Sequence, residues 1–231
     1  MNPSDTCILA IDFQENYRPG VNPEKTLTVP EWNQILQNAN RLLAVARAVR
    51  TPIVHVTHLP GFCSGIVPYA AGWGKGMDLI VRRSNPIEEV LPLPHESEKK
   101  QQAKDVVGQW FHCTCLIPDR ELSRDPADYL VMKSGRNAFR DTGLIDFLAE
   151  RSVMHVCCMG FEAKDCVMFA AYTGAVRHKL HMTIVQDCTN GAEPTDMLEV
   201  ERGVHKTLAE LGIEFRTADE VARSLQGKIR A

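Results

Sequence analysis

The chain has 231 residues, of which 44% are hydrophobic and 24% charged, and its formal net charge is −3. This length fits one globular domain with a sizeable core, and the lack of a basic surplus argues against nucleic-acid binding. No segment resembles an export signal or a membrane helix of roughly 18 apolar residues, and eight scattered cysteines suit a reducing compartment, so we expect a cytoplasmic protein with a small-molecule substrate.

The first half of the chain predicts a strand, a long helix and two more strands. Residues 6–12 form a short apolar run that ends on an acid, which is typical of a buried parallel strand. From Trp32 to Val49, apolar side chains recur every three or four residues and so predict one buried helical face. Strands are expected next at 53–57 and 128–133.

The second half continues this alternation. Strands are expected at 153–159, 182–187 and 214–217. An apolar helical stretch follows Gly160, and another helix is expected after 187, with apolar positions at Met197, Val204, Leu208 and Leu211. Thr217 and Glu220 form a capping-box pattern that opens a terminal helix.

Strands that alternate with helices imply right-handed crossovers and a parallel sheet covered on both faces. We therefore predict a single domain over 1–231 with a three-layer α/β/α sandwich, built on a central, mostly parallel six-stranded sheet of Rossmann-like type. The segment 59–126 interrupts the alternation. Its length and its aromatic residues favour a lid or an oligomer contact, with one helix near 97–108.

Three chemically useful residues fall at the ends of predicted strands, where ligands bind in such folds. Cys166 opens a helix after a glycine turn, and backbone N–H groups at a helix start favour a thiolate and could form an oxyanion hole. Asp12 could take the thiol proton, and Lys133 could keep that carboxylate ionised. Each alone has an ordinary structural explanation, but their convergence favours a catalytic site.

Four motifs occur in a fixed order along the chain: Asp12-Phe-Gln14-Glu-Asn-Tyr17, Lys133-Ser-Gly-Arg-Asn137-Ala138-Phe139, Gly160 through Val167, and Val-Gln-Asp187. Together they resemble the isochorismatase-like cysteine hydrolase superfamily, which includes nicotinamidases, N-carbamoylsarcosine amidohydrolases, ureidoacrylate amidohydrolases and biuret hydrolases. The resemblance runs through most of the chain.

The resemblance implies a role for each motif. Asp12 would be the base, Lys133 its partner, and Cys166 the nucleophile that forms a thioester after ammonia or an amine leaves. A cis peptide would join Phe161 to Glu162, and the backbone N–H groups of Glu162 and Cys166 would form the oxyanion hole. A homo-oligomer, either dimer or tetramer, is also implied.

The substrate is less defined. Glu162 stands where the family has a small residue, and Asn137 where serine is common. Arg136 and Arg140 could bind a carboxylate, whereas Glu162 would disfavour an anion, so the substrate's charge stays open. The candidate substrate contacts are Phe13, Gln14, Tyr17, Trp73, Arg136, Asn137, Phe139, Phe161 and Tyr172.

We expect no metal and no cofactor. Nicotinamidases hold a metal through Asp-x-His after the second strand, but this chain has Val56-Thr-His58 there, which disfavours that activity. A zinc site from His55, His58, His112, Cys113 and Cys115 is disfavoured by their spacing.

The leading hypothesis is therefore a cysteine-dependent amidohydrolase that cleaves a C–N bond in a small amide, ureido or carbamoyl compound. The alternatives are a vinyl-ether hydrolase of isochorismatase type, against which Cys166 argues, and an idle binding scaffold of the same fold.

Overall fold

The computed structural model describes residues 3–14, 17–20, 27–58, 110–112, 128–133, 135–140 and 142–227. Trp73, the helix expected near 97–108, and all of the segment 59–126 except 110–112 lie outside the described residues. Within the described part, no helix is long and apolar enough to cross a membrane.

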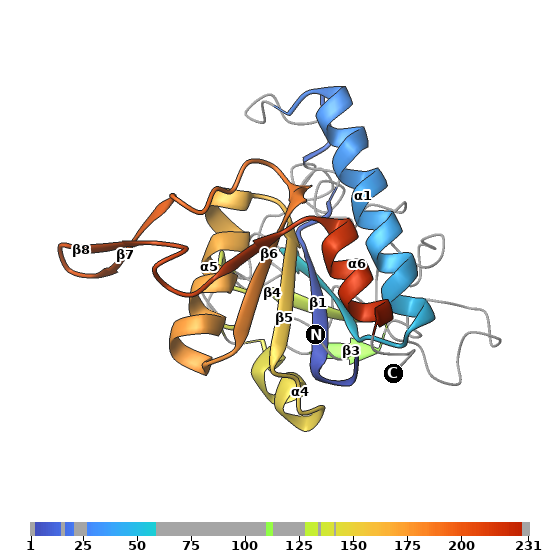
Figure 1. Ribbon diagram of the computed structural model, residues 1–231. Helices are drawn as coiled ribbons and strands as arrows, with labels where there is room; N and C mark the ends of the chain where they lie inside the picture. The colour runs from blue at the N-terminus through green and yellow to red at the C-terminus, as the bar shows by residue number, and fades with distance from the viewer. Residues whose placement is uncertain are drawn as a thin grey trace, which may run out of the picture.

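A central sheet with strand order β3-β4-β2-β1-β5-β6-β9 organises the molecule (Figure 1). Its strands are β1 (Thr6–Ile11), β2 (Ile53–His58), β3 (Trp110–His112), β4 (Asp128–Lys133), β5 (His155–Gly160), β6 (His181–Thr189) and β9 (Glu214–Arg216). Among the strands that the structure describes in this sheet, β3 alone pairs antiparallel, and the other neighbours are parallel. The predicted parallel strands are confirmed, and β3 is an additional strand that is too short to show a pattern of its own.

The central strand β1 explains why the sheet has two covered faces. All six of its residues are buried, and successive side chains in a strand point to opposite faces. Leu9 and Ile11 belong to one hydrophobic cluster, whereas Ile8 and Ala10 belong to another. The predicted three-layer α/β/α arrangement is therefore confirmed.

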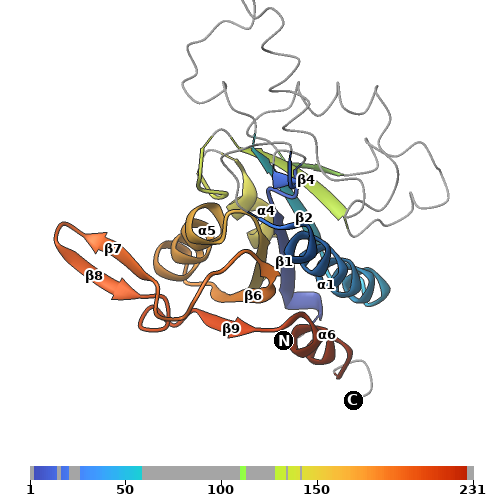
Figure 2. The same ribbon diagram turned by 90° about the horizontal axis from the view of Figure 1, so that it is seen from above.

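Helices α1 (Val29–Ala48) and α6 (Ala218–Gly227) cover one face of the sheet (Figure 2). Thr28 and Glu31 form a capping box at the start of α1, and Trp32 begins its buried face as predicted. At the start of α6, the backbone N–H of Thr217 donates to Glu220 over 2.7 Å, which confirms the second capping box.

The opposite face carries α4 (Leu144–Glu150) and α5 (Met168–Tyr172) (Figure 2). One turn of π-helix, Ala163–Val167, precedes α5 and another, Thr173–Arg177, follows it. This continuous helical stretch agrees with the helix predicted after Gly160.

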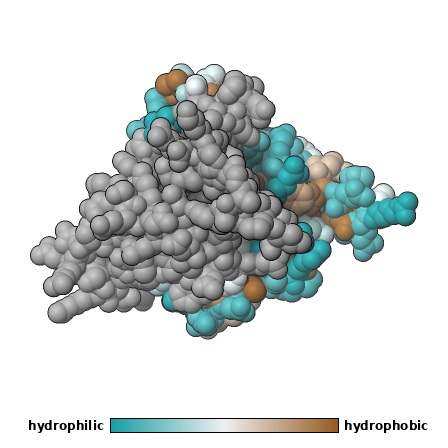
Figure 3. Space-filling view, turned by 180° about the vertical axis from the view of Figure 1, so that it is seen from behind, coloured by the Kyte–Doolittle hydropathy of each residue, from teal (hydrophilic) through white to brown (hydrophobic). Residues whose placement is uncertain are grey.

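The helix predicted through Met197 and Leu208 is wrong. The chain instead forms an antiparallel hairpin of β7 (Met197–Glu201) and β8 (Val204–Thr207) that projects from the body (Figure 1). Gly203 adopts a φ of 76° in its turn, which suits a hairpin connection. Seen from behind, the hairpin is mostly hydrophilic (Figure 3). Leu208 is buried, whereas Met197 and Val204 are exposed, so the predicted apolar positions do not form one buried helical face.

Candidate active site

The ends of three parallel strands bring the predicted catalytic residues together. Asp12 directly follows β1, Lys133 ends β4, and Cys166 lies six residues after Gly160, the last residue of β5. Strands β4, β2, β1 and β5 are consecutive in the sheet, so residues far apart in sequence meet at one edge.

The ammonium group of Lys133 connects the three residues. It donates to Asp12 Oδ2 over 2.7 Å, to Cys166 Sγ over 3.2 Å and to the Gly135 carbonyl over 3.1 Å. An ammonium group has three N–H donors, so each of them has an acceptor. The side chains of Asp12 and Lys133 are completely buried, and Cys166 is 6% exposed. The site is therefore a preformed, water-poor cluster.

Asp12 adopts an uncommon backbone conformation, and one of its carboxylate oxygens can accept a hydrogen bond. Its φ is 52°, a left-handed conformation that non-glycine residues adopt rarely and often at functional sites. Its backbone N–H donates to the Val56 carbonyl over 2.8 Å. Among the described residues, the buried Oδ1 has no hydrogen-bond partner, so it can accept a further proton.

Electrostatics keep the resting thiol protonated. Burial, followed by the negative charge of Asp12, raises the pKa of Cys166 to about 12, although Lys133 acts in the opposite direction. Burial lowers the pKa of Lys133, but the attraction of Asp12 and Cys166 outweighs it and leaves that pKa above its ordinary value. The expected thiolate at the helix start is thus disfavoured, because burial and a nearby carboxylate dominate there.

Gly160 permits the tight approach between β5 and β1. Its φ is 120°, and a Cβ on it would lie 1.9 Å from the Ile11 carbonyl oxygen. The next backbone N–H, that of Phe161, donates to the same carbonyl over 2.9 Å. The peptide between Phe161 and Glu162 is cis, as the family resemblance implied.

The turn that carries Cys166 is fixed by a residue that no motif marked. Asn190, which follows β6, accepts a hydrogen bond from the Ala163 N–H over 2.8 Å. The Glu162 carbonyl accepts from the backbone N–H groups of Asp165 and Val167 over 3.1 and 3.2 Å. An Asn-Gly pair after a strand usually indicates only a turn. The sequence therefore did not predict that Asn190 would bond to the turn that carries Cys166.

Phe161 lies at the centre of an aromatic group beside the site. Its ring stacks on Tyr17 at 5.3 Å and on Trp32 at 5.4 Å between centroids, and Phe13 meets it edge-on at 5.3 Å. Such pairs add to the stabilisation by burial. Three of the predicted apolar contacts therefore lie together, and Trp32 of α1 completes the group.

Three other predicted substrate-contact residues interact with residues of the protein itself. Asn137 donates to the Thr173 hydroxyl over 2.8 Å and accepts from the Phe139 N–H over 3.0 Å. Phe139 is buried against the His178 ring, 5.1 Å away, and Tyr172 packs partly buried on the core. These three residues join the lysine loop to the helical stretch.

Three further residues singled out in the sequence lie near the cluster or in the core. Arg136 is exposed and its Nε lies 3.3 Å from Asp165, the neighbour of Cys166. Gln14 is buried two residues after Asp12. His55 is buried in β2, as expected for a residue in a packed layer.

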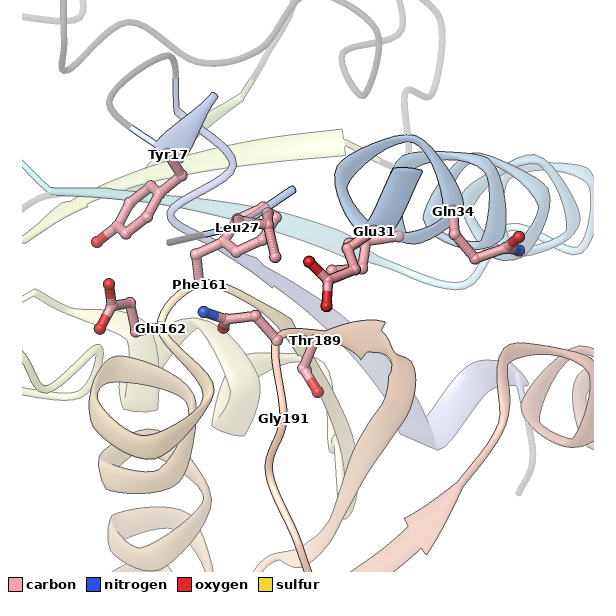
Figure 4. A pocket seen from close by; sticks show the side chains of 10 residues that line it. Tyr17, Leu27, Glu31, Gln34, Phe161, Glu162, Thr189 and Gly191 are labelled. Atoms are coloured by element: carbon pink, nitrogen blue, oxygen red, sulfur yellow. The ribbon is translucent and has the colours of Figure 1, made fainter. Parts of the chain in front are cut away.

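A cavity of about 540 Å³ opens beside the aromatic group (Figure 4). It is lined by Tyr17, Leu27, Glu31, Gln34, Ile35, Phe161, Glu162, Thr189, Asn190 and Gly191. In the close view, the hydroxyl of Tyr17 and the carboxylate of Glu162 point toward one another. The contributions from α1 and from Thr189, Asn190 and Gly191 were not predicted, because none of the four motifs includes these residues.

Comparison with known proteins agrees with the resemblance seen in the sequence motifs. The sequence pattern of the isochorismatase domain matches residues 6–206, and no curated protein sequence matches the chain. Similar solved structures include a cysteine hydrolase from Pseudomonas syringae pv. phaseolicola, at 17% identity and a TM-score of 0.61, covering 98% of this chain and 95% of that one.

Two further structures share the fold. The N-carbamoylsarcosine amidase from Thermoplasma acidophilum has 16% identity and a TM-score of 0.57, with 93% of this chain and 97% of that one covered. An isochorismatase from Pseudomonas putida KT2440 has 17% identity and a TM-score of 0.56, with 95% and 91% covered.

Proposed function

This chain belongs to the isochorismatase domain family, and we propose that it is a cysteine-dependent amidohydrolase of small amide, ureido or carbamoyl compounds. The observation that carries the proposal is the contact of Lys133 Nζ with both Asp12 and Cys166, at 2.7 and 3.2 Å. A base, a cation and a thiol in mutual contact are the groups that an acyl transfer to sulfur requires.

In the first step, Cys166 Sγ attacks the carbonyl carbon of the substrate while its proton passes to Asp12. A carboxylate base is needed because the thiol, with a pKa raised to about 12, is protonated at neutral pH. Lys133 stabilises the negative charge that develops on sulfur, 3.2 Å from its ammonium group. The carbonyl electrons form an oxyanion, which the backbone N–H groups of Glu162 and Cys166 would bind.

In the second step, the C–N bond breaks and the proton on Asp12 moves to the departing nitrogen. Ammonia or an amine leaves, and the acyl group remains on Cys166 as a thioester. Water then attacks the thioester carbon and gives a proton to Asp12, the C–S bond breaks, and that proton returns to the sulfur. The net reaction consumes one water and yields a carboxylic acid and an amine.

The test is ammonia release from a panel of small amides, ureas and carbamoyl amino acids. Cys166→Ala should lower the rate at least about a thousandfold, as the removal of a nucleophile does. The matched control is Cys7→Ala, which removes a buried thiol from the other end of β1. Equal activity in wild type and Cys166→Ala would exclude a thioester.

The same variant separates the two remaining functions. A vinyl-ether hydrolase of isochorismatase type does not need a nucleophilic cysteine, so Cys166→Ala would still cleave a vinyl ether. A binding scaffold would release no product from either class of compound. Acid-quenched protein from a productive reaction should carry the acyl mass on the Cys166 peptide, which neither alternative produces.

A further inference from the structure

We propose that the cavity beside the aromatic group binds a positively charged end of the substrate, so that the preferred substrates are small amides bearing an ammonium, amidinium or guanidinium group. The inference rests on the amidohydrolase function proposed above and adds a substrate class to it.

The cavity adjoins the reaction centre through Tyr17 and Glu162, which both line it. Burial, followed by the negative charge of Asp12, raises the pKa of Tyr17, so its phenol stays neutral. The volume of about 540 Å³ falls within the roughly 300–1,000 Å³ of small-molecule sites. Because Glu162 lines the cavity and its backbone N–H belongs to the proposed oxyanion hole, a substrate bound at that hole can extend into the cavity.

The charged groups on the cavity wall are acidic. Of the described residues that line it, Glu31 and Glu162 carry carboxylates and none is basic. Hydrogen bonds from Thr28 lower the pKa of Glu31, which is therefore ionised at neutral pH. Figure 4 shows Glu162 below Tyr17, and Glu31 on the other side of Phe161 at the start of α1. Both carboxylates therefore favour a cation in the cavity.

The remaining wall also suits a cation. Neutral hydrogen-bonding groups come from Gln34, Thr189 and Asn190, and the ring of Tyr17 offers an aromatic face, which attracts ammonium and guanidinium groups. Arg18 shows this attraction nearby, since its guanidinium lies 5.4 Å from the Trp32 ring centroid.

The cations that border the reaction centre offer little to an anionic substrate. Lys133 contacts Asp12 at 2.7 Å, and Arg136 lies 3.3 Å from Asp165. These two cations thus already face a carboxylate. This arrangement argues against the predicted role of Arg136 as a carboxylate anchor and leaves the acidic cavity as the charge-selective feature.

The test compares three amides of similar size: 5-aminopentanamide, a cation; hexanamide, which is neutral; and glutaramate, an anion. The readout is kcat/KM from ammonia release. A charge-assisted hydrogen bond predicts a preference of about tenfold or more for 5-aminopentanamide over hexanamide, with glutaramate last. Equal rates for the three amides, or a preference for glutaramate, would overturn the inference.

Two variants test the acidic wall. Glu31→Gln and Glu162→Gln should each reduce the ratio of the kcat/KM values for 5-aminopentanamide and hexanamide severalfold. Glu220→Gln is the matched control for Glu31→Gln, because Glu220 caps α6 through Thr217 in the way that Glu31 caps α1 through Thr28. Its ratio should equal that of the wild type, and equal ratios in all four proteins would contradict the inference.

A binding measurement separates this inference from the proposed function. Calorimetry with Cys166→Ala should show tighter binding of 5-aminopentanamide than of hexanamide, whether or not the wild type hydrolyses either compound. If 5-aminopentanamide binds preferentially but the wild type hydrolyses neither amide, the proposed amidohydrolase function is contradicted and the cation site is supported. If the wild type hydrolyses the amides but Cys166→Ala binds 5-aminopentanamide no more tightly than hexanamide, or binds neither, the cation site is contradicted and the amidohydrolase function is retained.

Discussion

The side-chain oxygen of Asn190 accepts a hydrogen bond from the backbone N–H of Ala163 over 2.8 Å and so joins the end of β6 to the turn that carries Cys166. This contact crosses between two strands of the sheet and reaches the first residue of the helical stretch. It therefore bears on how accurately the proposed nucleophile, Cys166, is placed.

Asn190→Ala should reduce kcat for any accepted amide about tenfold or more, because the Ala163 N–H loses its acceptor and the turn relaxes. Asn190→Asp keeps an acceptor oxygen and should retain most of the activity. A positional role requires kcat to fall further than KM rises, with a melting temperature close to that of the wild type. If Asn190→Ala and Asn190→Asp lose activity equally, the acceptor is not what matters.

Alkylation of Cys166 should be slow at neutral pH and should rise steeply with pH, because the pKa of the thiol is raised to about 12. Asp12→Asn removes the nearby charge that raises this pKa and leaves Lys133 in place to lower it. We expect at least about tenfold faster alkylation at pH 8 in Asp12→Asn, together with loss of amide hydrolysis. Mass spectrometry of the Cys166 peptide after iodoacetamide treatment measures both rates.

Slower alkylation of Cys166 in Asp12→Asn than in the wild type would show that Asp12 stabilises the thiolate rather than accepting its proton. A melting curve of Asp12→Asn is the necessary control, because the substitution leaves the buried ammonium of Lys133 with a weaker partner.

Stability should fall as the pH rises above about 8.5, the ordinary pKa of a thiol. Among the described residues, the fold raises the pKa of five buried thiols, with burial as the largest cause in each: Cys7, Cys157, Cys158, Cys166 and Cys188. Above about 8.5 the unfolded chain releases these protons first, so the stabilisation present at lower pH is lost progressively as the pH approaches the folded values.

Each such thiol should contribute a loss of about 1.4 kcal/mol per pH unit within that window. Urea unfolding at pH 8, 9 and 10 under reducing conditions measures the slope. A variant with alanine at Cys7 and Cys158 should show a shallower slope, whatever its stability at pH 8. An unchanged slope would contradict the linkage.

Gly160→Ala should prevent the approach of β5 to β1, because its Cβ would meet the Ile11 carbonyl oxygen at 1.9 Å and its φ is 120°. We expect a loss of several kcal/mol or failure to fold. Gly203→Ala is the matched control, since Gly203 also has a positive φ, 76°, but a methyl group added there would meet no atom of the described residues within 4 Å. Its cost should be about 1 kcal/mol, and thermal melting of the two variants compares them.

The sequence predicted the parallel strands and the meeting of Asp12, Lys133 and Cys166, because strand ends in such sheets converge irrespective of distance along the chain. It could not predict the hairpin at 197–207, since its widely spaced apolar residues fit more than one structure. The cavity was also unpredictable. Glu31 and Asn190 lie in different layers with ordinary local roles, a helix cap and a turn, and only the tertiary fold joins them.

The protonated resting state of Cys166 has a consequence for the chemistry of oxidants. Peroxides react with thiolates and hardly at all with thiols. Because the residue is 6% exposed and its proton is held by burial and by Asp12, the resting protein offers peroxide little to attack. In the proposed mechanism, the thiolate forms only when a carbonyl compound is bound and Asp12 receives the proton, so the proposed nucleophile would be generated together with its target and would otherwise be protected from oxidation.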